Sequence, residues 1–299
     1  MSRRNGLVAP VLALFAACSS SERPVVVGSK NFTEQVVLGE ILAQLLESRG
    51  VPVERRLNLG GTFICHRAIV AGDIDVYVEY TGTALTAILK ETPSPDADAV
   101  YGRVREVYQK DLGLAWTEPF GFENTFAIAM KPETAERLGI RKISDLKAHE
   151  RTLRAGVGHE FFEREDGFRG LTAAYDLKFE NPPRGIELGL IYQALTEGEV
   201  DFVAGSATDG LIDKFGLVVL EDDRSYFPPY DAAAVYRPET AERVPALAEV
   251  LRLLEGGLDE AVMRDLNRQV DDEGRGAPEV VRSFLEKRGW SAFRGSRAP

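Results

Sequence analysis

The strongest constraint on the fold is a short pattern that occurs twice, at residues 68–75 and 194–201. Each copy has an apolar helix end, a glycine, an acidic turn and then the apolar residues of a buried strand. The copies lie 126 residues apart, and further strands and helices alternate around both. Such alternation predicts parallel βαβ units, so we expect an α/β chain with two lobes of like architecture. A repeat this short also fits convergence on a common βαβ design.

The strand after the first copy ends in oxygen-bearing residues, from Glu79 to Thr83, and includes Tyr80. In open α/β sheets, ligands bind at this carboxyl edge of the strands. The same offset places Ser206 opposite Tyr80 and Asp209 opposite Thr83, so two like lobes would bring both strand ends to one cleft. Tyr80 by itself fits a ligand contact and an ordinary half-buried strand tyrosine equally well.

Three loops carry further candidate positions. Residues 28–35 join a strand to a helix for which Thr33 is the expected N-cap, so an anionic group can be held there, and a capped helix with nothing bound is the alternative. Residues 60–62, Gly-Gly-Thr, permit close approach of a ligand to the backbone. Two prolines in 226–231 stiffen the loop that presents Tyr230, unless the loop merely packs on its own aromatic rings.

Charge and motifs exclude several function classes. A formal charge of −11 and a pI of about 5.0 argue against a nucleic-acid partner. No Gly-x-Ser-x-Gly elbow, P-loop or paired-histidine helix occurs. No nucleophile accompanies His159, Glu160 and Asp209, the candidates for base and orienter. Three separated histidines and two cysteines predict neither a metal site nor a disulfide framework, and Cys65 is expected to be a small buried residue. We therefore predict a binding protein without cofactor or metal, not an enzyme.

The first 18 residues are expected to lie outside the fold. Two arginines, the apolar run 7–15 and then Ala-Ala-Cys18 predict an export signal, and the run is too short to span a bilayer. The end of this segment resembles a bacterial lipobox, in which Cys18 carries lipid, and soluble export with cleavage nearby is the alternative. We expect residues 19–23 to be a tether. The mature protein would lie in the periplasm or on the outer face of the membrane, with lipid as its only anchor.

Residues 24–299 are predicted to form two lobes joined by two crossings. Proline, glycine and aromatic residues near 119–126 mark the first crossing, and the charged turn that begins at residue 221 marks the return. Lobe I is then expected at 24–121 plus 221–299, and lobe II at 122–220. Two crossings make a hinge that can close on a ligand.

Six motifs, in the same order, resemble the substrate-binding proteins of osmoprotectant ABC importers, which take up glycine betaine, choline and related quaternary amines. They are Val-Gly-Ser-Lys-Asn-Phe-Thr-Glu-Gln (27–35), Leu-Asn-Leu-Gly-Gly-Thr (57–62), Asp-Val-Tyr-Val-Glu-Tyr-Thr-Gly-Thr-Ala-Leu (75–85), Gly-Phe-Glu-Asn-Thr-Phe-Ala (121–127), Thr-Asp-Gly (208–210) and Phe-Pro-Pro-Tyr-Asp-Ala (227–232). The resemblance extends from about residue 24 to 286. It implies a type II periplasmic-binding-protein fold, with two βαβ lobes and a two-crossing hinge. It also implies a monomer that delivers its ligand to an ABC permease with an ATPase subunit.

The resemblance also implies a cage for a quaternary ammonium group, which has no N–H to donate but is attracted to aromatic faces by about 0.5–2 kcal/mol per ring. The implied cage positions are Tyr80, Phe126, Ser206 and Tyr230, with Gln35, Thr83 and Asn124 as polar contacts. Tyrosine is usual at all four cage positions, so Ser206 removes one ring, and Phe120, Phe122 or Phe161 is the expected replacement. The other candidates for ligand contacts are Lys30 (toward a carboxylate), Asp209 (toward a cation, or only as a cap), Thr62 and His159.

Other functions remain open at this point. Within the binding class, the ligand can be another small polar solute, such as an amino acid. Outside it, a non-transport sensor or an enzyme can be built on the same fold.

Overall fold

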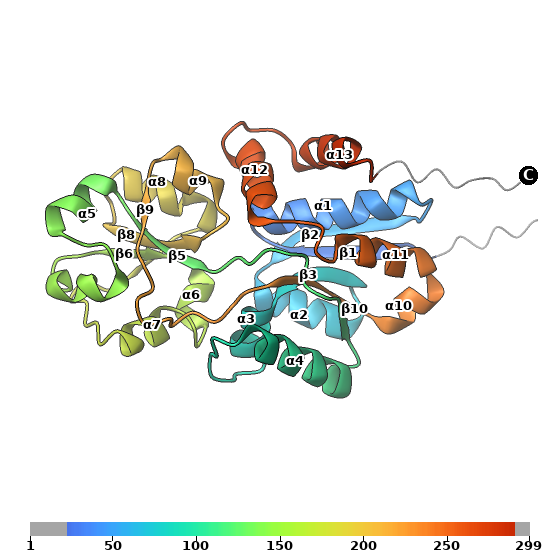
Figure 1. The fold of residues 1–299 in the computed structure, drawn as a ribbon, viewed down its shortest axis with the longest axis horizontal. Coiled ribbons are helices and arrows are strands. Elements are labelled where there is room, and N and C mark those ends of the chain that lie inside the picture. Colours follow the sequence, from blue (N-terminus) through green and yellow to red (C-terminus); the bar gives the residue numbers. More distant parts are fainter. Residues whose placement is uncertain (1–22, 291–299) are drawn as a thin grey trace, which may run out of the picture.

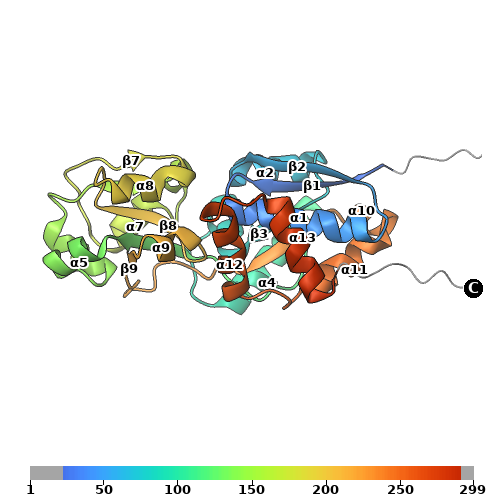
Figure 2. The ribbon, with the colours of Figure 1, turned by 90° about the horizontal axis from the view of Figure 1, so that it is seen from above.

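The computed structural model describes residues 23–290, which form two α/β lobes at opposite ends of a long molecule (Figure 1). The view from above shows the same two lobes with α12 beside their junction (Figure 2). The predicted export signal, Cys18 and residues 19–22 of the predicted tether lie outside the described residues.

The first lobe contains a five-stranded sheet in the order β2-β1-β3-β10-β4. Strand β1 is parallel to β2 and β3, whereas β10, from late in the sequence, is antiparallel to β3 and β4. The strands are β1 (Val25–Lys30), β2 (Val53–Gly60), β3 (Val76–Tyr80), β4 (Ala115–Trp116) and β10 (Ala232–Tyr236). The α-helices are α1 (Thr33–Ser48), α2 (Thr62–Ala71), α3 (Thr81–Thr83), α4 (Ala97–Val107), α10 (Pro238–Arg243), α11 (Pro245–Leu254), α12 (Glu260–Asp271) and α13 (Ala277–Arg288), with π-helical turns at 84–88 and 108–112.

The second lobe repeats this plan with a sheet in the order β7-β6-β8-β5-β9. Strand β8 is parallel to β6 and antiparallel to β5. The strands are β5 (Phe126–Met130), β6 (Ala155–Val157), β7 (Arg184–Gly185), β8 (Phe202–Ser206) and β9 (Val218–Val219). The helices are α5 (Pro132–Leu138), α6 (His159–Glu163), α7 (Phe168–Ala174), α8 (Ile191–Thr196) and α9 (Gly210–Lys214), with 3-10 turns at 143–149 and 188–190.

The 126-residue repeat corresponds to equivalent strands in the two lobes. Strands β3 and β8 each lie between a parallel and an antiparallel neighbour. The glycine before each strand, Gly72 or Gly198, has a left-handed φ of 80° or 77°, which an L side chain rarely adopts. An acidic residue three positions after each glycine accepts a backbone hydrogen bond from a neighbouring strand segment. Asp75 accepts from the Val26 N–H, and Asp201 accepts from the Arg154 N–H. The repeated sequence therefore encodes one structural unit, and the prediction of two like α/β lobes is confirmed.

Two chain crossings join the lobes, one green and one orange in Figure 1. They lie side by side, because Glu123 pairs with Asp231 and the Asn124 N–H donates to the Tyr230 carbonyl at 3.1 Å.

The predicted return at residue 221 lies too early in the sequence. Glu221 pairs with Lys142 of the second lobe, and the Asp222 carboxylate accepts hydrogen bonds from the Tyr175 hydroxyl and the Tyr226 N–H. The charged turn is therefore held by lobe II and does not leave it. We move the proposed boundary between the lobes to about residue 227.

Helix α1 organises the core of lobe I and brings its first turn to the junction between the lobes. Of the apolar side chains along this helix, Val36 is only half-buried, whereas Val37, Ile41, Leu42, Leu45 and Leu46 are inaccessible to solvent. The predicted N-cap at Thr33 is wrong, since Phe32 holds the cap position. The Thr33 hydroxyl instead donates to the Asp271 carboxylate of α12 at 2.5 Å. Cys65 is buried as predicted.

Gly82, in the turn after β3, lies so close to the second crossing that it has no room for a side chain. A Cβ there would lie 2.6 Å from the Pro229 carbonyl oxygen. We expect Gly82→Ala to lower the free energy of unfolding by about 1–3 kcal/mol, because backbone would have to shift. Gly102→Ala in α4, where a Cβ meets nothing within 4 Å, should raise it by about 0.5–1 kcal/mol. Equal melting temperatures for wild type and Gly82→Ala would contradict this close packing.

Candidate functional site

A cavity of about 690 Å³ lies between the lobes and is lined by both. Ten of the eleven sequence-predicted site residues line it, namely Lys30, Thr62, Tyr80, Thr83, Asn124, Phe126, His159, Ser206, Asp209 and Tyr230. Gln35 does not line it. Its side chain is 1% exposed, and its amide oxygen lies 3.5 Å from the Lys30 N–H. The predicted convergence of the two strand ends therefore occurs, since Tyr80 ends β3 and Ser206 ends β8.

Aromatic rings form one part of the cavity wall. Phe32 stacks on Tyr80 with ring centroids 6.4 Å apart. On the other lobe, Phe126 contacts Phe161 edge-on at 4.7 Å and Tyr230 at 5.6 Å. Ser206 contributes no ring to the cavity wall. Of the three expected replacements, Phe161 is the one that lines the cavity, beside Phe126. The alternatives Phe120 and Phe122 are buried in the core of lobe I and do not line the cavity.

Two protein cations already face these rings. The Lys30 ammonium lies 5.0 Å from the Tyr80 centroid, and the Arg164 guanidinium lies 5.1 Å from that of Phe126. Each cation has its own buried carboxylate, Glu79 for Lys30 and Asp166 for Arg164. Both cations are therefore neutralised, and the predicted contact of Lys30 with a ligand carboxylate would compete with Glu79.

Glu34, in the first turn of α1, is the least expected residue of the site. Its carboxylate is 3% exposed and accepts hydrogen bonds from the Tyr80 hydroxyl at 2.6 Å, from the Asn124 amide at 2.8 Å and from the Asn267 amide at 3.1 Å. Burial raises the pKa of Glu34 above its usual value, although hydrogen bonds from Thr208 and these three residues oppose the rise. Because all these donors are neutral, the site contains a buried acid without a cationic partner among the described residues.

Two more carboxylates lie near Glu34. Asp209 caps α9 by accepting a hydrogen bond from the Leu211 N–H at 3.0 Å, so the capping interpretation is confirmed, and it also lines the cavity. Burial raises the pKa of Asp209 to about 6, opposed by the Leu211 N–H and reinforced by the Asp271 carboxylate. The pKa of Asp271 is also raised by burial. The part of the cavity near Glu34, Asp209 and Asp271 therefore favours a positively charged ligand group.

We expect Asp209→Asn to stabilise the free protein in a pH-dependent way. An acid with a folded pKa of about 6 and an ordinary value of 3.8 binds its proton more tightly when folded, so its unfavourable contribution grows as pH rises from about 4 to about 6. The variant should gain about 1–3 kcal/mol at pH 7.5 and little at pH 3.5, since asparagine caps helices as well as aspartate. Urea unfolding at both pH values measures this. A gain of the same size at both would contradict the raised pKa.

The remaining candidates occupy the rim and floor of the cavity. His159, at the start of α6, has a side chain 65% exposed and lies 3.7 Å from Glu187, so it is a rim residue. Thr83 is buried on lobe I and accepts a hydrogen bond from Arg164 of lobe II at 3.1 Å. Gly61 does allow a close approach, but by protein, because a Cβ there would lie 1.8 Å from the Glu160 carboxylate.

The lining residues that sequence reasoning missed include Phe32, Glu34, Arg164, Asn267 and Asp271. Phe32 and Glu34 fall inside the 27–35 motif, so the motif itself was a usable signal. Arg164 lies in an irregular segment, and Asn267 and Asp271 lie on a helix whose sequence is typical of packing alone.

Residues 23–290 contain no group of three or more histidine, cysteine, aspartate or glutamate side chains placed to hold a metal ion. No helix in this range is both long enough and apolar enough to cross a membrane.

Comparison with known families decides the classification. The model of the substrate binding domain of ABC-type glycine betaine transport systems matches residues 23–287. The chain belongs to this family. Members of the glycine betaine substrate-binding family are components of ABC importers, act outside the cytoplasm and are not enzymes. The resemblance inferred from the six motifs is thereby confirmed.

Individual members of the glycine betaine substrate-binding family support this result. The chain is 37% identical to a glycine-betaine-binding protein of Pseudomonas aeruginosa, over 92% of this chain and 91% of that one. It is 35% identical to an ergothioneine transport permease/ergothioneine binding protein of Helicobacter pylori, over 95% of this chain but only 51% of that relative, about half its length. A crystal structure of a glycine betaine/carnitine/choline ABC transporter superposes with a TM-score of 0.73 at 31% identity, covering 89% of this chain and 99% of that chain. The predicted type II periplasmic-binding-protein fold is thus confirmed.

Proposed function

We propose that this chain captures a quaternary ammonium solute in the cavity between its lobes and delivers it to an ABC permease. The observation that carries the proposal is the juxtaposition of aromatic rings with Glu34, a buried carboxylate whose hydrogen-bond donors are all neutral. A ligand without a cationic group would leave this acid uncompensated. The relatives support the same class, since their names include glycine betaine, carnitine, choline and ergothioneine.

The rings recognise a trimethylammonium group because its charge is diffuse and it has no N–H to donate. Tyr80, Phe126 and Tyr230 remain the proposed walls, and Phe161 and Phe32 extend the same aromatic lining. Each ring contributes about 0.5–2 kcal/mol to the binding of a cation. The Lys30 ammonium already lies over the Tyr80 ring and the Arg164 guanidinium over the Phe126 ring, in keeping with that attraction.

Contacts between the lobes support closure over the ligand. Arg164 of lobe II donates to Thr83 of lobe I, and Asn267 of α12 donates to the Thr208 carbonyl of lobe II at 3.0 Å. Asn267 also donates to Glu34, so closure links the two lobes through a residue of the proposed cation site. Ligand binding and lobe closure are coupled if the ligand contacts both sides.

Titration calorimetry of residues 23–290 tests the proposed ligand class. The panel is glycine betaine, choline, carnitine and ergothioneine, with L-glutamate and L-proline as the amino-acid alternatives. We expect saturable binding of at least one quaternary amine, with a Kd of about 100 µM or lower, which corresponds to about 5.5 kcal/mol. Tight binding of an amino acid together with no heat from any quaternary amine would overturn the proposal and favour the amino-acid alternative.

We further propose that Cys18 carries lipid and that the protein acts with a permease and its ATPase subunit. The sequence before Cys18 supports the anchor. Expression of the full chain and of Cys18→Ser in a bacterium, followed by membrane fractionation, tests this. The wild type should sediment with membranes and the variant should not. Equal distribution of both would contradict the lipid anchor.

A further inference from the structure

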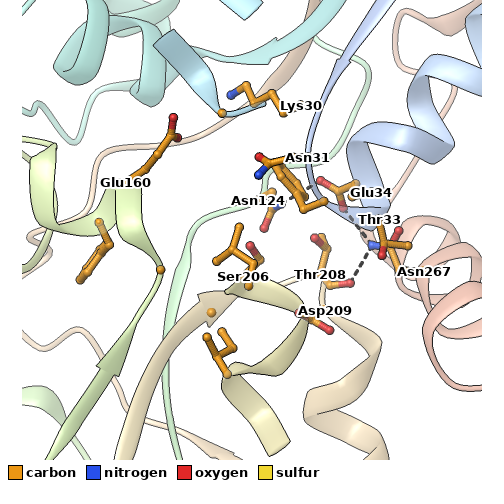
Figure 3. A pocket seen from close by; sticks show the side chains of 18 of the residues that line it. Lys30, Asn31, Thr33, Glu34, Asn124, Glu160, Ser206, Thr208, Asp209 and Asn267 are labelled. Atoms are coloured by element: carbon orange, nitrogen blue, oxygen red, sulfur yellow. Dashed lines mark hydrogen bonds between the residues drawn. The ribbon is translucent and has the colours of Figure 1, made fainter. Parts of the chain in front are cut away.

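The aromatic wall of the cavity has a gap at the end of β8. Ser206 ends this strand and lines the cavity (Figure 3). Its counterpart in the repeat of the two lobes is Tyr80, which ends β3 and also lines the cavity. The strand end that carries a ring on lobe I therefore carries only a hydroxymethyl group on lobe II.

The Phe126 ring borders this gap. Phe126 and Ser206 are directly opposite each other in the antiparallel pairing of β5 and β8. Side chains at such positions share one face of the sheet, with Cβ atoms about 4.5–5.5 Å apart, so a ring at residue 206 would cover one flank of Phe126. The rings that already contact Phe126 are those of Phe161, Phe227 and Tyr230. Ser206 brings no ring, which leaves the flank on its side to the ligand.

From the gap, the cavity continues along the edge of the lobe II sheet, where the backbone is bare. Gly205 lines the cavity, and Gly158 lies beside it, in the pair that follows Val157 and Ala204 in the register of β6 and β8. Leu188 lies over Gly158, since a Cβ on that glycine would be 2.6 Å from the Leu188 Cδ2. The aliphatic side chains that line this part of lobe II are those of Ile186, Leu188, Ile191 and Leu211.

This extension of the cavity favours an apolar group. Its aliphatic side chains make no hydrogen bonds, and Leu188 is 38% exposed, so apolar surface is there for a ligand to cover. The whole cavity, at about 690 Å³, falls within the roughly 300–1,000 Å³ that accommodates drug-sized ligands, and a trimethylammonium group fills only a small part of it. Because the extension opens beside Phe126, its occupant can be part of the same molecule as the cation.

We infer that the gap at Ser206 admits an apolar substituent of the quaternary nitrogen that is larger than methyl and extends along the edge of β8 toward Leu188. This inference rests on the proposed quaternary-amine function and narrows it. The preferred solutes are quaternary ammonium compounds in which an alkyl or aryl group replaces one N-methyl group. Ser206 is then a specificity-determining residue, because a larger side chain there would close the gap.

Two matched pairs of compounds test the inference by calorimetry on residues 23–290. The first pair is choline and its N-benzyl analogue, and the second is glycine betaine and its N-benzyl analogue. Within each pair the polar end is the same and one N-methyl group becomes benzyl. We expect each benzyl compound to bind about tenfold or more tightly than its trimethyl partner, because the extension buries the added ring.

Ser206→Tyr should reverse this preference. The new ring closes the gap, so each benzyl compound should bind about tenfold or more weakly than it does to the wild type. The same ring faces the cation, so each trimethyl compound should bind about twofold to thirtyfold more tightly. A benzyl preference that survives in Ser206→Tyr would overturn the assignment of the gap.

Two exposed leucines locate the far end of the extension. Leu188→Ser removes an aliphatic side chain from its wall and should lower the benzyl preference at least threefold. Leu190→Ser is the matched control, since Leu190 is 53% exposed and is not among the lining residues, and it should bind all four compounds as the wild type does. If Leu188→Ser keeps the benzyl preference of the wild type, the apolar group lies elsewhere and the inference is wrong.

The remaining outcomes separate the inference from the function on which it rests. If the wild type binds the trimethyl compounds as tightly as their benzyl analogues, or more tightly, the inference is overturned and the quaternary-amine function stands. No binding of any of the four compounds, or of the quaternary amines of the first panel, overturns both.

Discussion

Replacing Arg164 with methionine should lower the free energy of unfolding by about 3–5 kcal/mol, because it leaves a buried carboxylate without its cationic partner. Arg164 is 6% exposed and donates to Asp166, which is fully buried and also accepts a hydrogen bond from the Tyr230 hydroxyl. Although burial acts in the opposite direction, the Arg164 charge and these hydrogen bonds hold the pKa of Asp166 below its usual 3.8. Urea unfolding at pH 7.5 measures the loss.

The double variant Arg164→Met/Asp166→Asn is the control for this prediction. It also removes the Asp166 charge, which the single variant leaves buried without a cationic partner. The double variant should therefore recover at least half of the lost stability. The pH dependence follows from the lowered pKa: the contribution of Asp166 is present above pH 3.8 and is lost as pH falls through the still lower folded value. If the single variant unfolds like wild type, Asp166 is solvated and this description of the lobe junction is wrong.

Glu34→Gln should weaken binding of a quaternary ammonium ligand by about 2–4 kcal/mol, which is roughly thirtyfold to a thousandfold in Kd. The substitution keeps the shape of the side chain but removes the buried negative charge that faces the cation. The free protein should become no less stable, since burial already raises the pKa of Glu34 and disfavours its charged form. Calorimetry gives the affinity, and thermal unfolding without ligand gives the stability.

Glu47→Gln, on the exposed end of the same helix, is the matched control. Its side chain is 42% exposed and pairs with Arg55 outside the cavity, so its removal should leave the affinity unchanged. If Glu34→Gln and Glu47→Gln bind the ligand as tightly as wild type, the buried carboxylate does not recognise the cation.

The two-lobe architecture was predictable because its signals are local. The glycine at each helix end has a left-handed φ, and the acidic residue three positions later accepts a hydrogen bond from the backbone of a neighbouring strand segment. Both copies of the pattern therefore encode the same turn. The strand ends at Tyr80 and Ser206 then follow from the offset alone. The return crossing was misplaced because the turn at 221–226 is held by contacts with Lys142 and Tyr175, which lie far away in the sequence.

The candidate site was predictable where its residues end strands or form motifs, and not where packing decides. Gln35 and Glu34 are adjacent in one motif, yet only Glu34 lines the cavity, because successive helix positions point in different directions. Asn267 and Arg164 reach the site through the placement of α12 and of the segment after α6, which no local pattern records. The cations over the aromatic rings were unexpected for the same reason.

The central claim is that the rings and Glu34 hold a quaternary nitrogen between the lobes. The measurement that tests it most directly is a crystal structure with the tightest-binding compound of the calorimetry panel. We expect the quaternary nitrogen to lie within about 6 Å of the centroids of at least two of the Tyr80, Phe126, Phe161 and Tyr230 rings. We also expect Glu34 to be on the same side of the ligand. A ligand bound outside the cavity, or one whose nitrogen contacts none of these rings, would contradict the claim.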